Sequence, residues 1–305
     1  MSKISTHLDF SLKSLFILNP LTKKERKGRK YVPLSKRHYP GEEKHLQLRE
    51  GTVCYIDEGK GRPLVFIHGL SGNLNWWSLL IPEFKNKFRV IALDLPGHGK
   101  SGKTFKNYKL HSLTKYLAEF LELLDLKDPI LVGYSMGGAL TLQYLIEHPG
   151  RIRESIVIAP AGVRQPHHPI QQIVAKTSLH LPFLKKYLFP RAMAGSVTKR
   201  PEEILQIIYN SMYMTQDPDW KHFHNVVMTT TKDLLSFSVQ DRLHHIKTRL
   251  LAIWGEDDAL EPVGLASVLK TKTSNTQIEI IPECGHQPMF ESPQILIQEI
   301  KKFIK

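Results

Sequence analysis

Residues 130–144 contain a pattern that few folds can accommodate: an apolar run, a serine between two glycines, and a second run with helical spacing. The first run is typical of a buried strand and residues 139–144 are typical of a helix. Gly133 and Gly137 allow the sharp turn between them, which exposes Ser135 at the helix N-terminus. The pattern therefore predicts a nucleophilic serine; an ordinary serine N-cap is the alternative.

A serine hydroxyl needs a general base, and the base needs an acid that orients it. Two downstream runs typical of strands precede suitable residues. Residues 249–254 are followed by Gly255, Glu256, Asp257 and Asp258, and residues 277–281 are followed by a loop that contains His286. Sites in open α/β sheets lie at the carboxyl ends of strands, so we expect these loops to meet Ser135.

Five segments give the chain a resemblance to the α/β-hydrolase family, from about Gly51 to the C-terminus. In the family's order they are His-Gly-Leu at 68–70, Asp-Leu-Pro-Gly-His-Gly-Lys-Ser at 94–101, Gly-Tyr-Ser-Met-Gly-Gly at 133–138, Trp-Gly-Glu-Asp-Asp at 254–258 and Gly-His at 285–286. The resemblance implies an α/β fold with a mostly parallel central sheet, flanking helices and a helical cap inserted after the sixth strand.

The same resemblance implies a catalytic triad of Ser135, Asp258 and His286. The family pattern places the acid three residues after the glycine of the Trp-Gly-x-x-Asp segment, which selects Asp258. Asp257 is the alternative, and its other role would be that of a solvated or turn-capping carboxylate.

An oxyanion hole is expected from two backbone N–H groups, those of Leu70 and Met136. One follows an early strand and the other follows the nucleophile. His68 and His98 are expected to shape loops rather than to take part in the reaction.

Attack by a serine forms an acyl-enzyme that water resolves, so the predicted substrate carries an acyl group. The chain most resembles membrane-associated monoacylglycerol lipases and related carboxylesterases, which implies lipid or other apolar esters as small-molecule substrates. Carbon–carbon bond hydrolases of ring-cleavage diketones are an alternative, although they usually have other residues at the positions of Tyr134 and Gln287. A slow or non-catalytic ligand receptor on the same fold is a further alternative.

The chain divides into an N-terminal extension, a core in two parts and an insertion. Residues 1–45 form the extension, residues 46–162 and 245–305 form the hydrolase core, and residues 163–244 form the cap or lid domain. Apolar residues in the insertion recur at i, i+3 and i+4, for example in 204–209, which favours amphipathic helices.

Residues 1–45 carry 11 Lys and Arg against 4 Asp and Glu, so this segment supplies +7 of the formal charge of +13. Ile4, Leu8, Leu12 and Leu15 recur at helical spacing before the basic run. An apolar helical face beside a basic cluster is typical of a segment at an anionic membrane surface, and residues 1–37 are predicted to make that contact. The apolar run at 15–18 is too short to span a bilayer.

Other partners are not indicated by the sequence. The two cysteines, Cys54 and Cys284, do not suggest a disulfide framework, and no metal-ligand spacing is present, so neither a metal nor a cofactor is expected. No nucleic-acid recognition motif accompanies the basic charge. The absence of a signal-peptide cleavage site favours a cytoplasmic protein, at most peripheral at a membrane.

Overall fold

The computed structural model describes residues 39–164 and 220–304. These residues form an eight-stranded sheet with the strand order β1-β2-β4-β3-β5-β6-β7-β8. Strand β2 is antiparallel to both β1 and β4, and every other pairing is parallel. The strands are β1 (Glu43–Gln47), β2 (Thr52–Glu58), β3 (Pro63–Ile67), β4 (Arg89–Leu93), β5 (Ile130–Tyr134), β6 (Glu154–Ile158), β7 (Arg249–Gly255) and β8 (Thr276–Ile281).

The central strands are short apolar runs because both faces of the sheet are covered. All five residues of β5 are buried, as expected for a parallel strand between two helical layers. The helices are η2 (Leu74–Trp77), α2 (Ile81–Phe84), α3 (Leu110–Leu123), α4 (Met136–Glu147), α8 (Trp220–Leu234), η4 (Gln240–His245), α9 (Gly264–Lys272), α10 (Pro288–Glu291) and α11 (Pro293–Phe303).

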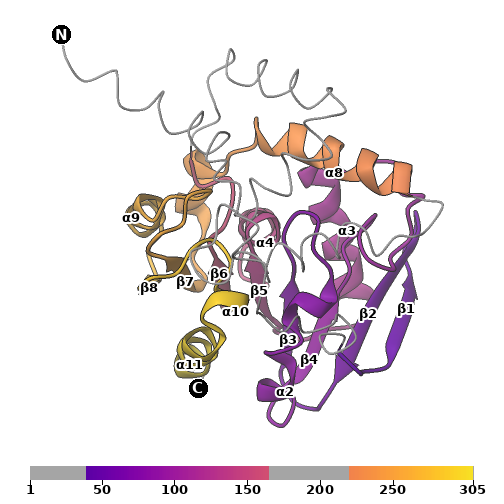
Figure 1. The fold of residues 1–305 in the computed structure, drawn as a ribbon, viewed down its shortest axis with the longest axis horizontal. Coiled ribbons are helices and arrows are strands. Elements are labelled where there is room, and N and C mark those ends of the chain that lie inside the picture. The colour runs from indigo at the N-terminus through magenta and orange to yellow at the C-terminus, as the bar shows by residue number, and fades with distance from the viewer. Residues whose placement is uncertain (1–38, 165–219, 305) are drawn as a thin grey trace, which may run out of the picture.

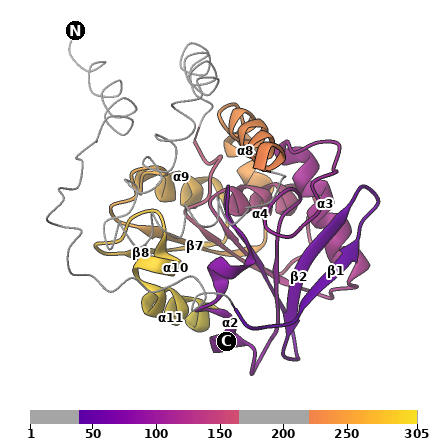
Figure 2. The same ribbon diagram turned by 45° about the vertical axis from the view of Figure 1, so that its right-hand side comes forward.

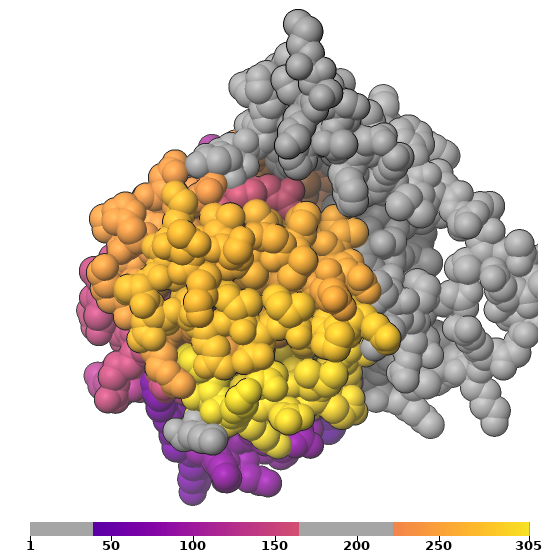
Figure 3. Space-filling model, turned by 90° about the vertical axis from the view of Figure 1, so that its left-hand side faces the viewer, coloured from indigo at the N-terminus to yellow at the C-terminus, as the bar shows by residue number. Residues whose placement is uncertain are grey.

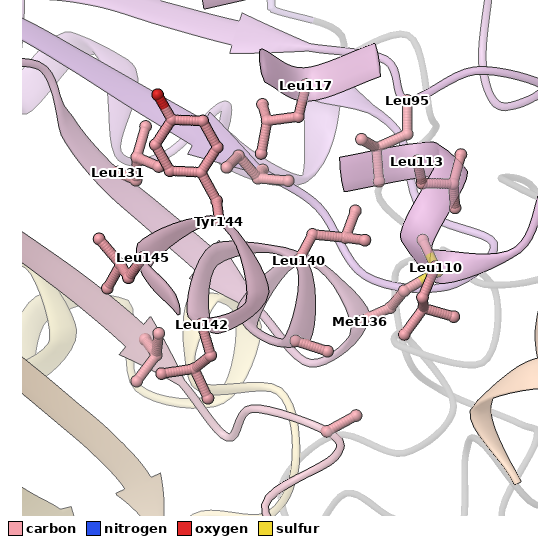
Figure 4. Close-up of a cluster of buried hydrophobic side chains, with 14 of the residues drawn as sticks. Leu95, Leu110, Leu113, Leu117, Leu131, Met136, Leu140, Leu142, Tyr144 and Leu145 are labelled. Carbon is pink, nitrogen blue, oxygen red and sulfur yellow. The ribbon is translucent and has the colours of Figure 1, made fainter. Parts of the chain in front are cut away.

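Two hydrophobic cores lie on opposite faces of the sheet. Figures 1 and 2 show α3, α4 and α8 on one side and α2 and α11 on the other. Successive residues of β5 alternate between them: Leu131 packs with α3 and α4, whereas Ile130 and Val132 pack with η2, α2 and α11. Figure 4 shows the first of these cores around α4, with Leu131, Leu140, Leu142 and Leu145 among its side chains. The predicted fold class is confirmed.

Helix α8 is fastened to the core by polar contacts as well as by apolar packing. The Asp233 carboxylate accepts the N–H of Leu110 at 2.8 Å, which places a negative charge at the N-terminus of α3. Thr230 Oγ1 donates to the carbonyl of Tyr108 at 2.9 Å. These two contacts hold α8 against the N-terminus of α3 and the residues just before it.

The sheet begins before the boundary predicted at residue 46. Strand β1 starts at Glu43, and the side chain of Tyr39 is already buried. The N–H of Tyr39 donates to Asn75 Oδ1 at 3.0 Å. These long-range contacts have no local sequence signal, which is why the boundary was predicted slightly late.

Most of the predicted extension and cap falls outside the described residues, namely 1–38 and 165–219. Within the described part, β6 and β7 are neighbours in the sheet although residues 159–248 separate them in sequence, so a long segment follows the sixth strand. Figure 3 shows the face at the opposite end of the sheet from β1, where residues coloured orange to yellow cover most of the described surface. In the described ranges, none of the helices has the length and apolar character needed to cross a membrane.

Candidate active site

The candidate site lies where several parallel strands end. Ser135 follows β5, Asp258 lies in the turn after β7, and His286 lies in the loop after β8. Because β5, β6, β7 and β8 are consecutive in the sheet and parallel, their carboxyl ends share one edge. The strand order therefore brings together residues that are 151 and 28 positions apart in sequence.

Ser135 occupies a strained turn between β5 and α4. Its φ of 50° lies in the left-handed region, which a residue with a side chain rarely adopts. The N–H of Ser135 donates to the carbonyl of Ile158 at 2.9 Å, which holds the turn against the end of β6. Its side chain makes no N-cap hydrogen bond with α4, so the hydroxyl is available to other partners.

The two glycines of the turn are needed because backbone approaches them closely. A Cβ on Gly137 would lie 2.3 Å from the carbonyl oxygen of Ile67, and one on Gly133 would lie 2.4 Å from the carbonyl oxygen of Gly137. Neither contact can be relieved by rotating a side chain. The turn therefore has its tight geometry only with glycine at both positions.

A continuous chain of hydrogen bonds joins Ser135, His286 and Asp258. His286 Nδ1–H donates to Asp258 Oδ2 at 2.7 Å, which leaves Nε2 of the neutral ring as the acceptor for Ser135 Oγ at 3.1 Å. Both His286 and Asp258 are buried, whereas Asp257 is exposed. The structure thus brings three of the predicted residues together and leaves the alternative acid outside the group.

The environment of His286 favours its protonated form. Burial lowers the pKa of His286, but the charge and hydrogen bond of Asp258 raise it, as do the charges of Glu261 and Glu291, and the resulting pKa lies above the usual 6.5. A base of this kind is well suited to accept a proton from a serine hydroxyl.

Glu291 holds the loop of His286 from both sides. Its two carboxylate oxygens accept the N–H groups of Gly285 and Gln287, each at 3.0 Å. These are the residues directly before and after His286, so the carboxylate fixes the backbone on which the imidazole is mounted. This role of Glu291 was not predicted from the sequence, because an acid four positions after a loop residue is a common and weak signal.

The loop that carries Leu70 packs against the nucleophile turn. A Cβ on Gly69 would lie 3.2 Å from the Cβ of Ser135, and Met136 is the first residue of α4. Ser71 has a φ of 58°, so the loop turns sharply directly after Leu70. Both residues predicted for the oxyanion hole therefore lie in segments adjacent to Ser135.

His68 joins this loop to the end of β4. Its Nδ1–H donates to the carbonyl of Gly69 at 2.7 Å, and its Nε2 accepts the N–H of Leu95 at 3.0 Å. The second bond requires the neutral ring, and burial, with a smaller contribution from His98, holds the pKa of His68 well below 6.5. The geometry is consistent with the loop-shaping role expected from the sequence.

Asp94, the first residue of the segment at 94–101, also holds loops near the site. Its carboxylate accepts the N–H groups of Leu74 and Lys100, both at 2.7 Å, and burial raises its pKa to about 7.

In residues 39–164 and 220–304, no three His, Cys, Asp or Glu side chains are grouped so that they could hold a metal ion.

A family model for the α/β-hydrolase fold matches residues 62–185. The chain therefore has the fold of the α/β-hydrolase superfamily. Among solved structures, it is similar to Est816, an N-acyl homoserine lactone degrading enzyme, with a TM-score of 0.73 and 22% identity. The match covers 86% of this chain and 100% of that structure, and at this identity the likeness concerns the fold.

Three curated relatives illustrate the range of the superfamily. The chain is 28% identical over 256 residues to the dihydrolipoyllysine-residue acetyltransferase component of the acetoin cleaving system from Pseudomonas putida. This match covers 80% of this chain but only 64% of the Pseudomonas protein. The chain is 25% identical over 264 residues to a monoacylglycerol lipase of Xenopus laevis, covering 79% and 75% of the two chains. It is 26% identical over 252 residues to a 2-hydroxy-6-oxononadienedioate/2-hydroxy-6-oxononatrienedioate hydrolase of Comamonas testosteroni, covering 77% and 85%.

Proposed function

We propose that this α/β-hydrolase is a serine esterase of the lipase type, which cleaves carboxylic esters of lipids or other apolar acyl groups. The observation that carries the proposal is the hydrogen-bonded chain from Ser135 Oγ through His286 to Asp258. The similarity to a monoacylglycerol lipase supports an acylglycerol or a related ester as the substrate.

In the proposed reaction, Ser135 Oγ attacks the acyl carbon while its proton passes to His286 Nε2. The oxyanion of the tetrahedral intermediate faces the N–H groups of Leu70 and Met136. Collapse breaks the ester bond, and His286 gives its proton to the departing alcohol. Water then attacks the acyl-enzyme, loses a proton to His286 and releases the carboxylic acid and the free serine.

Labelling with a fluorophosphonate tests the nucleophile directly. We expect wild-type protein to be labelled once, at Ser135, and Ser135→Ala to lose both labelling and at least about a thousandfold in esterase activity. Ser267→Ala is the matched control, because Ser267 is an exposed serine in α9. Folded wild-type protein that does not react at Ser135 would indicate a non-catalytic ligand receptor instead.

The substrate class is tested with p-nitrophenyl esters of increasing chain length, monoacylglycerols and ring-cleavage diketones. We expect turnover of the esters. The relative from Comamonas testosteroni supports carbon–carbon bond hydrolysis as the second candidate, and preferred turnover of the diketones would select it.

We also propose that residues 163–244 form a cap over the site and that residues 1–37 bind anionic membranes. The basic charge of the N-terminal segment supports the second idea, since each basic residue near an anionic surface contributes about 1 kcal/mol. Deletion of residues 1–30 should release the protein from anionic vesicles and leave hydrolysis of a soluble ester intact. Vesicle binding that survives this deletion would rule out the proposed contact.

A further inference from the structure

The turn after β7 holds the proposed acid with its own backbone. Asp258 Oδ1 accepts the N–H groups of Leu260 and Glu261, at 2.9 and 2.8 Å, while Oδ2 faces His286. Trp254 Nε1–H donates to the carbonyl of Glu261 at 2.9 Å. The orientation of the Asp258 carboxylate therefore depends on where residues 260 and 261 are held.

Arg164 holds both of these residues. Its guanidinium donates to the Glu261 carboxylate, from Nη2 at 2.7 Å and from Nε at 3.2 Å, and Nη2 also donates to the carbonyl of Leu260. The planar guanidinium can make these contacts together because its donors are fixed in one fork. Arg164 lies 97 positions before Glu261 in the sequence, in the segment that leaves the core after β6.

The pair is largely buried beside the candidate site. The side chains of Arg164 and Glu261 are 29% and 14% exposed. Burial raises the pKa of Glu261, and the charge and hydrogen bonds of Arg164 oppose that rise. The pKa of Glu261 stays above its usual value, because burial outweighs the opposing effect of Arg164.

Glu261 also acts on the imidazole through its charge. The ionisable groups around His286 are Asp258, which binds it, Glu261 and Glu291, whose charges raise its pKa, and the buried Tyr134, whose ring lies 5.2 Å from the imidazole. Burial, together with the charges of Asp258, Glu291 and Glu261, keeps the pKa of Tyr134 well above its usual value. Cys284 lies in the same loop as His286 and acts on Tyr134 in the same direction.

We propose that Arg164 and Glu261 are positioning residues for the reaction: the ion pair fixes the turn that orients Asp258, and the Glu261 carboxylate stabilises protonated His286. The inference rests on the proposed serine hydrolase function. It assigns a role to a charged pair that belongs to neither the predicted triad nor the predicted oxyanion hole.

The test uses the full chain with the variants Arg164→Gln, Arg164→Lys, Glu261→Gln and the double variant Arg164→Gln/Glu261→Gln. Rates of p-nitrophenyl acetate hydrolysis are expressed per serine labelled by fluorophosphonate, so that unfolded protein does not contribute. We expect Arg164→Gln to lower kcat about tenfold with little change in KM, because the acid is misoriented while substrate binding is retained. Lysine should restore part of kcat, since its single ammonium can contact one of the two acceptors.

Glu261→Gln should shift the acid limb of the pH–rate profile to lower pH, because it removes a negative charge that favours protonated His286. The double variant should keep that shift and should be less impaired in kcat than Arg164→Gln, since no unpaired carboxylate stays buried. Imidazole NMR of His286 in a Ser135→Ala background follows the same titration without turnover.

Arg153→Gln is the matched control, because Arg153 also pairs with a carboxylate, Asp128, but its side chain is 80% exposed at the start of β6. Variants of the Arg164–Glu261 pair that match this control in kcat and in the His286 titration would overturn the inference. Wild-type protein that neither labels nor hydrolyses the ester would refute the proposed function instead, while the NMR titration would still report on Glu261.

Discussion

The imidazole of His286 combines nearly complete burial with a raised pKa. Burial alone would lower the pKa of a histidine, so the surrounding carboxylates must outweigh it. One of them, Asp258, binds Nδ1–H directly and two others act through space. At the scale of single residues, the proposed base is tuned by three carboxylates from two segments, the turn after β7 and helix α10.

The pH dependence of ester hydrolysis should report this tuning. Only neutral His286 can accept the serine proton, so activity falls as pH decreases through its pKa. We expect the acid limb of kcat/KM to have its midpoint above 6.5, measured with a soluble ester, since kcat/KM reports the free enzyme. A midpoint below 6.5 would contradict the predicted balance of burial and charge.

The two neighbouring aspartates provide a matched pair for the acid. Asp258→Asn should lower kcat by about four orders of magnitude, because an amide favours the wrong imidazole tautomer. Asp257→Asn should remain close to wild type, since Asp257 is exposed. Steady-state rates on a soluble ester compare the two, and a larger loss with Asp257→Asn would reverse the assignment.

The element that presents Ser135 is the turn between β5 and α4, and its shape depends on close backbone packing. Gly137 lies against the carbonyls of both Ile67 and His68 at the end of β3. The turn thus packs directly against the loop that carries Leu70. A change at Gly137 would affect the proposed nucleophile and the proposed oxyanion hole together.

Gly137→Ala should therefore destabilise the fold by about 3 kcal/mol or more and slow fluorophosphonate labelling of Ser135. The new Cβ would lie 2.3 Å from a backbone oxygen. Gly264→Ala is the control, because a Cβ there meets nothing within 4 Å, and it should change the free energy of unfolding by less than about 1 kcal/mol. Urea denaturation measures both variants, and equal effects would show that the turn tolerates a side chain.

At the scale of the whole molecule, the carboxyl edge of the sheet carries the candidate site and its opposite edge carries ion pairs. Arg62 pairs with Asp128 and Arg249 pairs with Glu154 near the starts of β3, β5, β6 and β7. His68 and His98 are both buried, and the centroids of their rings lie 5.2 Å apart. The folded state therefore contains two histidines that resist protonation.

Acid should destabilise the fold through His98. Burial lowers its pKa to about 4, so between 6.5 and about 4 the unfolded chain binds a proton that the folded chain does not. Stability from this residue is present above 6.5 and is lost as pH falls, by roughly 3 kcal/mol over the window. Asp94 and His286, whose raised pKa values act in the opposite direction, are common to wild type and variants.

Urea denaturation of His98→Gln and wild type at several pH values isolates this contribution. The difference in free energy of unfolding between the two should change by that amount as pH falls. His245→Gln is the control, because His245 is an exposed histidine in η4. A pH-independent difference for His98→Gln would show that His98 is not held neutral by the fold.

The features that depend on local pattern could be predicted from the order of the amino acids. The buried strand, the glycine-flanked Ser135 and the following helix are contiguous, so their backbone conformations follow from side-chain size and apolar spacing. The resemblance of the segments that contain Ser135, Asp258 and His286 to the α/β-hydrolase family then implied the fold class. Local chemistry was sufficient because the carboxyl ends of parallel strands share one edge of a sheet.

Contacts between residues far apart in sequence could not be predicted in this way, because they depend on the folded arrangement. The contact between Arg164 and Glu261 and the capping of α3 by Asp233 join segments whose proximity follows from the strand order and the packing of the helices. A charged residue in a loop has the same local pattern whether it is solvated or paired. Its role is set by burial, and burial depends on the packing of the whole chain.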